Sequence, residues 1–185
     1  MSDTTRWPYL PSDRPFAVMT VDDRWCALSM PLDWAPLVVG ALGDLCGPVY
    51  AEPGLNRAYW LLPSGAGADW PDLSGASVEW HRTGAEVLVP GPDGCGGSMA
   101  WHRYPLDDSP VFTEPAALRL ALETLLGPLE TAGALGPVAI CHFCDHPSRD
   151  VKLIAWGEQM SGPGWSRYAC RPCMRRGLRD IRADP

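Results

Sequence analysis

Long apolar segments are missing from this chain. None of its 185 residues falls in a stretch of about 18 or more apolar residues, the length that a membrane-spanning helix needs. The N-terminal sequence MSDTTRWPYLPSDRPF also lacks the charged-then-apolar order of a secretion signal. We therefore expect a soluble, cytoplasmic protein with no membrane partner.

Common motifs for binding phosphates or activating a nucleophile are missing too. The sequence contains no P-loop, no Gly-x-Gly-x-x-Gly and no Gly-x-Ser-x-Gly. Each of these motifs depends on a backbone geometry that other sequences do not readily adopt. Their absence argues against the familiar nucleotide-binding and serine-hydrolase classes.

Positive charge is scarce and unevenly distributed. The chain has 15 Lys and Arg against 22 Asp and Glu, a net charge of −7, and Lys152 is its only lysine. Residues 141–185 hold eight basic and five acidic residues, whereas residues 1–140 hold seven and seventeen. Nucleic acid is bound largely through its phosphates, so the acidic part is a poor surface for it. Any nucleic-acid contact is expected at the C-terminal end.

Four of the seven cysteines form two Cys-x-x-Cys pairs near the C-terminus, a spacing that lets four thiolates converge on one tetrahedral zinc ion. They are Cys141, Cys144, Cys170 and Cys173. Four protein ligands leave no open position for a catalytic water, so we predict structural Zn²⁺. A redox dithiol is the alternative, but such a pair normally stands in a βαβ context. His142 and His146 are expected outside the ligand set because the cysteines complete it.

The other cysteines carry no evident chemistry. Cys26 stands in an apolar run and is expected to be a small buried hydrophobe. Cys46 and Cys95 flank glycines and are expected to be partly exposed.

Arginines gather around the second cysteine pair. The candidates for binding a partner are Arg171, Arg175, Arg176 and Arg179. Their structural alternative is to offset the charge of about −2 that zinc and four thiolates carry together. Basic runs are also common on faces that contact only solvent.

The pattern of apolar residues predicts an α+β fold with a mixed or antiparallel sheet and two main helices. An irregular arm (1–14) is followed by an α/β domain (15–129), a linker (130–140) and a zinc module (141–185). The apolar runs 16–21 and 24–30 predict a hairpin that turns at Asp22-Asp23. Further strands are expected at 49–52, 57–63, 78–82, 85–90 and 98–104, and the strands of a zinc-module hairpin at 151–156 and 166–170.

Helical spacing occurs twice. One helix is expected from Pro31 to the Gly47-Pro48 stop, and another after Thr113, whose hydroxyl can cap it. The zinc module, with a hairpin between two cysteine turns, resembles a zinc ribbon or treble clef.

Two stretches of the main domain carry a resemblance to a known family. They are GPVYAEPGLNRAYWLLPSGA (47–66) and GASVEWHRTGAEVLVPGPDGCGGSMAWHRYP (75–105). The second has an acidic residue, a glycine turn, an apolar strand, a Pro-x-Pro-like end and an aromatic strand. Together, over roughly residues 15–126, they resemble the N-terminal domain of bifunctional DNA primase/polymerases. The resemblance implies an α/β core built on an RNA-recognition-like sheet.

The chain departs from this family at the positions that carry its catalysis. Such polymerases hold two divalent cations about 4 Å apart with carboxylates. Where the family has an Asp-x-Asp pair, this chain reads Ala-Leu-Ser-Met (27–30), and where it has a histidine, Tyr-Trp-Leu-Leu (59–62). Only Glu79 falls at the position of a family carboxylate. The comparison implies an inherited fold without the polymerase site, so no catalytic residue is assigned.

The tripeptide Trp-His-Arg occurs twice, at 80–82 and 101–103, on two expected strands. If these strands were neighbours, His81 and His102 could meet on one face of the sheet. Aromatic and basic cross-strand pairs also stabilise sheets without any chemistry.

These observations favour a non-catalytic, intracellular binding or accessory protein with a protein partner. One alternative is a nucleic-acid-binding regulatory or replication accessory protein that acts through the arginine-rich zinc end. The other is an enzyme with an unrecognised site around Glu79, His81 and His102.

Overall fold

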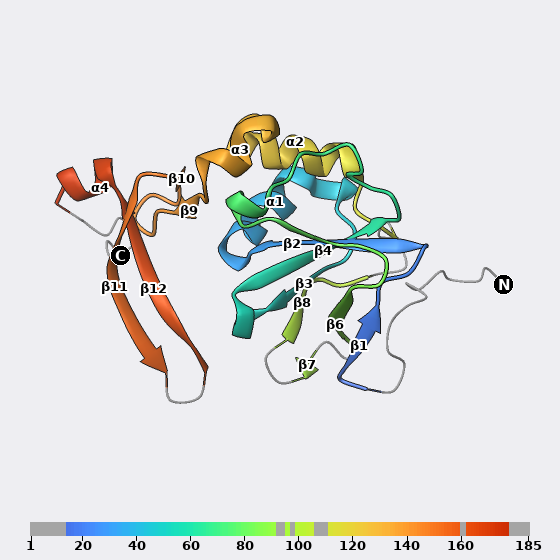
Figure 1. Cartoon of the computed structure of the whole chain (residues 1–185). Helices are drawn as coiled ribbons and strands as arrows, with labels where there is room; N and C mark the ends of the chain where they lie inside the picture. The colour runs from blue at the N-terminus through green and yellow to red at the C-terminus, as the bar shows by residue number, and fades with distance from the viewer. Residues whose placement is uncertain (1–13, 92–94, 97–98, 106–110, 160–161, 178–185) are drawn as a thin grey trace.

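The computed structural model describes residues 14–91, 95–96, 99–105, 111–159 and 162–177 (Figure 1). The expected arm at 1–14 therefore lies almost entirely outside the described residues. The described chain is α+β, as predicted, with a six-stranded antiparallel sheet and three two-stranded ones. None of the helices within the described ranges is both long and apolar enough to cross a membrane.

The six-stranded sheet has the strand order β5-β2-β4-β3-β8-β7. Its strands are β5 (Glu79–His81), β2 (Trp25–Pro31), β4 (Arg57–Pro63), β3 (Val49–Glu52), β8 (Met99–Arg103) and β7 (Cys95–Gly96). In β2 and β4 all residues but those at the strand ends are buried, so both faces of the sheet are covered there. The sheet thus lies in the middle of the main core.

Helices cover one face of this sheet (Figure 1). They are α1 (Ala35–Leu42), which follows the 3-10 turn η1 (Leu32–Trp34) and leads into η2 (Gly43–Leu45), and α2 (Pro115–Leu126). The predicted cap of α2 is displaced by one residue, because the Glu114 carboxylate accepts the helical N–H of Ala117. Thr113 is buried instead, and its hydroxyl accepts the backbone N–H of Gly47 at 3.1 Å.

The predicted hairpin of 16–21 and 24–30 is wrong. β1 (Phe16–Thr20) pairs antiparallel with β6 (Glu86–Pro90), and β2 belongs to the other sheet. The pairing continues past β1, since Val21 donates to the Ala85 carbonyl at 2.8 Å. β1 leaves alternate residues exposed, whereas β2 is buried on both faces. Strands with such different environments belong to different layers.

Residues 130–140 do not form the expected flexible linker. They contain most of α3 (Leu129–Leu135) and the short strand β9 (Ala139–Ile140). Leu129 and Ala132 are fully buried, and α3 lies against η4 (Ser74–Ala76). A Cβ at Gly133 would come within 2.5 Å of the Asp72 carbonyl oxygen. The small residues that suggested a linker instead allow a close helix contact.

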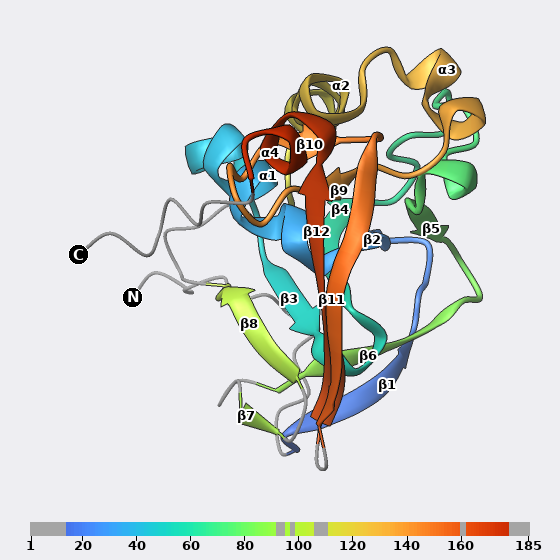
Figure 2. The ribbon, with the colours of Figure 1, turned by 90° about the vertical axis from the view of Figure 1, so that its left-hand side faces the viewer.

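The C-terminal module is joined firmly to this core. It comprises β10 (Pro147–Ser148), which pairs with β9, the hairpin of β11 (Val151–Gln159) and β12 (Gly162–Cys170), and α4 (Arg171–Arg175). The Trp34 indole N–H donates to the Val138 carbonyl at 3.2 Å, and the Arg149 guanidinium donates to the Leu126 carbonyl at 2.7 Å. β12 also lies against η3 (Pro53–Leu55). Figure 2 shows the hairpin extending along one side of the main domain.

Candidate metal centre

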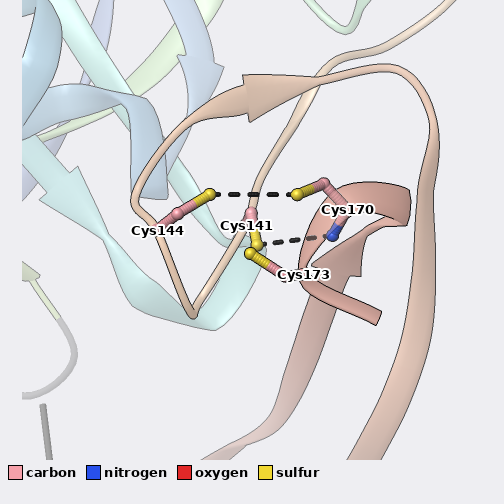
Figure 3. Close-up of side chains that lie close together, drawn as sticks. All are labelled: Cys141, Cys144, Cys170 and Cys173. Atoms are coloured by element: carbon pink, nitrogen blue, oxygen red, sulfur yellow. Dashed lines mark hydrogen bonds between the residues drawn. The ribbon is translucent and has the colours of Figure 1, made fainter. Parts of the chain in front are cut away.

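The first cysteine pair stands in a tight turn between β9 and β10. Cys141 donates its backbone N–H to the His146 carbonyl at 3.0 Å, and Asp145 donates to the Cys141 carbonyl at 2.8 Å. Asp145 takes a left-handed conformation, with φ of 54°, which aspartate tolerates better than most residues. The turn folds the chain back after Cys144 and leaves both thiols on its inner side (Figure 3).

The second pair stands where β12 runs into α4. Cys170 ends the strand, and Cys173 lies in the first turn of a helix that has proline near its start. The Cys170 backbone N–H donates to the Cys141 sulfur at 3.3 Å. The hairpin therefore carries the second turn back onto the first.

The four sulfur atoms converge. All lie within 4.8 Å of one another, and the Cys144 and Cys170 sulfurs are 3.8 Å apart (Figure 3). Zinc–sulfur bonds of about 2.3 Å in a tetrahedron require sulfur–sulfur separations of about 3.8 Å. The cluster is therefore the right size for one such ion, and the four cysteines could hold zinc without any other ligand.

The thiols of this cluster differ in acidity. Burial disfavours the Cys141 thiolate, but hydrogen bonds from the backbone N–H groups of Cys170 and Phe143, and from Cys144, together outweigh that effect and lower the pKa of Cys141 to about 6. Burial and the neighbouring cysteines raise the pKa of Cys173 to about 12, and burial likewise raises that of Cys144. Four crowded thiols cannot all ionise alone, whereas a divalent cation would favour the thiolate form of each.

The two nearby histidines take other roles. The His142 ring accepts the Tyr168 backbone N–H on Nδ1 at 3.1 Å, and the His142 backbone N–H donates to the Tyr168 carbonyl at 2.9 Å. These bonds tie the first cysteine turn to β12. The His146 side chain is exposed.

The arginines are placed mostly on the surface of the module. Arg171 forms an ion pair with Asp150 at 2.9 Å, and Arg175 and Arg176 are exposed at the end of α4. Arg176 also donates its backbone N–H to the Cys173 carbonyl at 3.1 Å. Arg179 lies outside the described residues. The arginines at the end of α4 that the structure describes therefore face solvent.

A polar network lies on one face of the six-stranded sheet, at its β5 end. His81 Nε2 and the Ser29 hydroxyl are 2.8 Å apart, and the Arg57 guanidinium donates to the same hydroxyl at 2.7 Å. Arg57 also lies 3.4 Å from Glu79. Burial lowers the pKa of His81. Ser29 is only 1% exposed, so this hydroxyl is a structural hydrogen-bonding group and not an accessible nucleophile.

The two Trp-His-Arg strands are not neighbours. β5 carries His81 and β8 carries His102, and β2, β4 and β3 lie between them in the sheet. Strands are spaced about 4.8 Å apart, so His81 and His102 are separated by nearly 20 Å and share no site. Glu79 and His81 are brought together on β5 instead, beside Ser29.

Sequence reasoning missed the contribution of Ser29 and Arg57, and it misplaced Cys46. Ser29 is the one buried hydroxyl in an otherwise apolar part of β2, which is the only signal that could have found it. Cys46 is fully buried, and the next residue, Gly47, packs directly on the backbone of Phe112 and Thr113. Cys26 is buried as expected, and the side chain of Cys95 lies outside the description.

Comparison of the chain with protein-family models, with curated proteins and with solved structures finds no match. The assignment of function therefore depends on the geometry of this chain alone.

Proposed function

We propose that this chain is a non-catalytic binding or accessory protein whose C-terminal module is held together by structural zinc and contacts a partner protein. The observation that carries the proposal is the closed set of four converging sulfur atoms. A zinc ion with four protein ligands has no free position for water or substrate, so the metal stabilises structure instead of catalysing a reaction. Thiolate ligands of this kind persist in a reducing compartment, which favours the cytoplasm.

The composition of the module supports a structural role for the metal. Among the described residues, its buried cluster consists of Cys141, Cys170 and Cys173, with Phe143 and Val151 packed against them. So small an apolar cluster cannot fold a module by itself, and metal binding supplies the missing free energy. The ion would hold the first turn, the β11–β12 hairpin and α4 as one unit.

We propose further that the main domain shares the fold of the primase/polymerase N-terminal domain without its catalysis. The register of the sheet supports this idea, since Ser29 lies opposite both Glu79 on β5 and Tyr59 on β4. The stretches 27–30 and 59–62, where the family carries its Asp-x-Asp pair and its histidine, thus lie beside each other, and Glu79 lies next to the first. In this chain Ser29 and Tyr59 offer a hydroxyl and a phenol there, and these groups cannot replace the carboxylate ligands that hold divalent cations.

The absence of catalysis can be tested directly. The full chain, supplied with a primed template, nucleoside triphosphates and either Mg²⁺ or Mn²⁺, is expected to incorporate no nucleotide. Incorporation that is lost in Glu79→Gln would overturn the proposal and support the enzyme alternative at Glu79 and His81. A Glu86→Gln variant, with an exposed carboxylate on β6, is the matched control.

A nucleic-acid partner is the second candidate, favoured by the exposed side chains of the hairpin. Trp156 is 65% exposed, and Lys152 and Arg167 are exposed on the same two strands. Aromatic and basic groups together can stack on bases and neutralise phosphates. Fluorescence anisotropy with a labelled 20-nucleotide single strand at low salt tests this candidate. Binding that weakens in Trp156→Ala and with added salt would support it, and the lack of any binding would exclude it.

A further inference from the structure

Two hollows lie side by side along α1, where the main domain meets the first cysteine turn. The first, of about 460 Å³, is lined by Asp33, Pro36, Leu37, Ile140, His142 and Asp145. The second, of about 320 Å³, lies between α1, α2 and the start of β10, and its lining includes Val38, Ala41, Leu125 and Pro147. Both are open to solvent on one side.

Leu37 lines both hollows and joins them into one groove. From Asp33 to Ala41 the groove follows the helical direction for about 12 Å, at about 1.5 Å of rise per residue. This length matches about four residues of an extended chain, at about 3.3 Å each. The groove therefore has the size of a short linear segment.

The floor of the groove is apolar and accessible. Leu37 lies at its centre and is 40% exposed, and the side chains around it are mostly aliphatic. Apolar surface that is concave and bordered by polar groups is typical of sites that bind other proteins. The half-open shape suits a peptide better than a small molecule, which is usually enclosed on most sides.

Charge distinguishes the two ends of the groove. Two carboxylates, Asp33 and Asp145, line the first hollow, whereas no carboxylate lines the second. Carboxylates at the edge of an apolar site favour a positively charged group on the partner and disfavour phosphates. Carboxylates at one end of an apolar groove therefore fit a basic protein segment better than a nucleic acid.

We propose that this groove binds a short segment of a partner protein that presents apolar side chains and one arginine or lysine, with the basic side chain at the Asp33 end. The proposal rests on the proposed binding function and specifies its partner. Ile140, His142 and Asp145 form one wall, and these residues flank the zinc ligands Cys141 and Cys144. The metal would therefore shape a binding surface at the junction of the two parts of the chain.

Selection of peptides tests the proposal. A library of random seven-residue peptides displayed on phage is selected on the immobilised, zinc-loaded full chain, and the recovered peptides are synthesised. We expect them to combine apolar residues with arginine or lysine. When these peptides are titrated into the isotope-labelled full chain, the NMR signals of the backbone amides in α1 and residues 140–147 should shift.

Two matched pairs of variants locate the binding. Leu37→Asp should weaken the selected peptides about tenfold or more, as expected for the centre of a binding site. Leu120→Asp replaces another exposed helical leucine, 66% exposed and outside the groove, and should leave affinity unchanged. Asp33→Asn should weaken arginine-containing peptides several-fold, whereas Asp44→Asn should not.

Recovery of acidic peptides, equal loss in both leucine variants, or failure to recover any peptide that depends on Leu37 would overturn the proposal. Zinc content measured on the same samples separates this outcome from failure of the proposed function. A zinc-loaded chain whose peptides shift only β11 and β12 would refute the groove and leave the binding function standing. A chain without zinc would refute the proposed function itself.

Discussion

Tyr50 and Tyr59 are stacked neighbours whose hydroxyl groups have opposite surroundings. Their rings lie 4.7 Å apart and nearly parallel. The Tyr59 hydroxyl donates to the Glu52 carboxylate at 2.9 Å, whereas that of Tyr50 is buried without a hydrogen-bond partner among the described residues. A buried polar group without a partner costs free energy, and a paired one stabilises.

Removing each hydroxyl should therefore change stability in opposite directions. We expect Tyr50→Phe to raise the free energy of unfolding by about 1 kcal/mol and Tyr59→Phe to lower it by about the same amount. Urea denaturation of the two variants beside the unmodified chain measures both changes. Equal losses in the two variants would show that the Tyr50 hydroxyl has a partner.

His81 makes stability depend on pH. Burial lowers its pKa below the usual 6.5, so the unfolded chain binds a proton more readily than the folded one. The stabilisation by neutral His81 is then complete above pH 6.5 and is lost as the pH falls below that value towards the lower folded pKa.

Replacement of His81 isolates this effect from other titrating groups. The unmodified chain should lose more stability between pH 7.5 and 5.5 than His81→Gln, which cannot titrate, when both are unfolded with urea. His102→Gln, an exposed histidine on β8, serves as the control and should behave as the unmodified chain. Parallel profiles for the chain and His81→Gln would contradict the assignment.

The convergence of the four cysteines was easier to predict than the hydrogen-bonded network around Ser29. The Cys-x-x-Cys spacing named the four cysteines because a metal site needs fixed residue types at short local separations. The network of Ser29, Arg57 and His81 joins three strands, and its members are 28 and 52 residues apart along the chain. A local sequence pattern cannot indicate these hydrogen bonds, because they form only when the order of the strands in the sheet brings the three residues together.

Among the elements, α3 shows that composition and packing can lead to different structures. Its sequence, LETAGAL, contains mostly small residues that are common in flexible linkers, and the prediction of a linker followed from that composition. The elements with strong periodicity were predicted at nearly the right place, including α1, β4 and the β11–β12 hairpin. The partner of β1 was not, because strand pairing over some 70 residues depends on the whole fold.

Two glycines in helices test whether α3 is packed as described. Gly133→Ala should destabilise the chain by about 1–3 kcal/mol, because the new methyl group would press on the Asp72 carbonyl. Gly40→Ala in α1 meets nothing within 4 Å and should stabilise by about 0.5–1 kcal/mol. Thermal unfolding measures both. If both substitutions stabilised the chain, residues 129–135 would not pack against the segment around Asp72.

At the scale of the molecule, the described residues form two buried clusters of very different size. The main cluster spans both faces of the six-stranded sheet, whereas the C-terminal one is built around three cysteines. Apolar burial can hold the fold around the first cluster, whereas the proposed structural zinc would hold the second together. The two parts should therefore respond differently to loss of zinc.

Chelation should loosen the C-terminal module and spare the main domain. After a strong chelator is added, hydrogen exchange should become fast in residues 141–177 and stay slow in β2 and β4. The main thermal transition should shift little, because β2 and β4 are buried in the main cluster, which contains none of the four paired cysteines. Simultaneous loss of protection in both parts would contradict this division.

The ligands and stoichiometry of the metal test the central claim most directly. Metal analysis and zinc X-ray absorption on the full chain, purified without chelator, should give about one zinc per chain with four sulfur neighbours at about 2.3 Å. Cys173→Ser should lower the zinc content, and Cys26→Ser, at a buried cysteine outside the cluster, should not. Absence of zinc, or a coordination shell with an exchangeable water in place of a sulfur, would contradict a closed structural site.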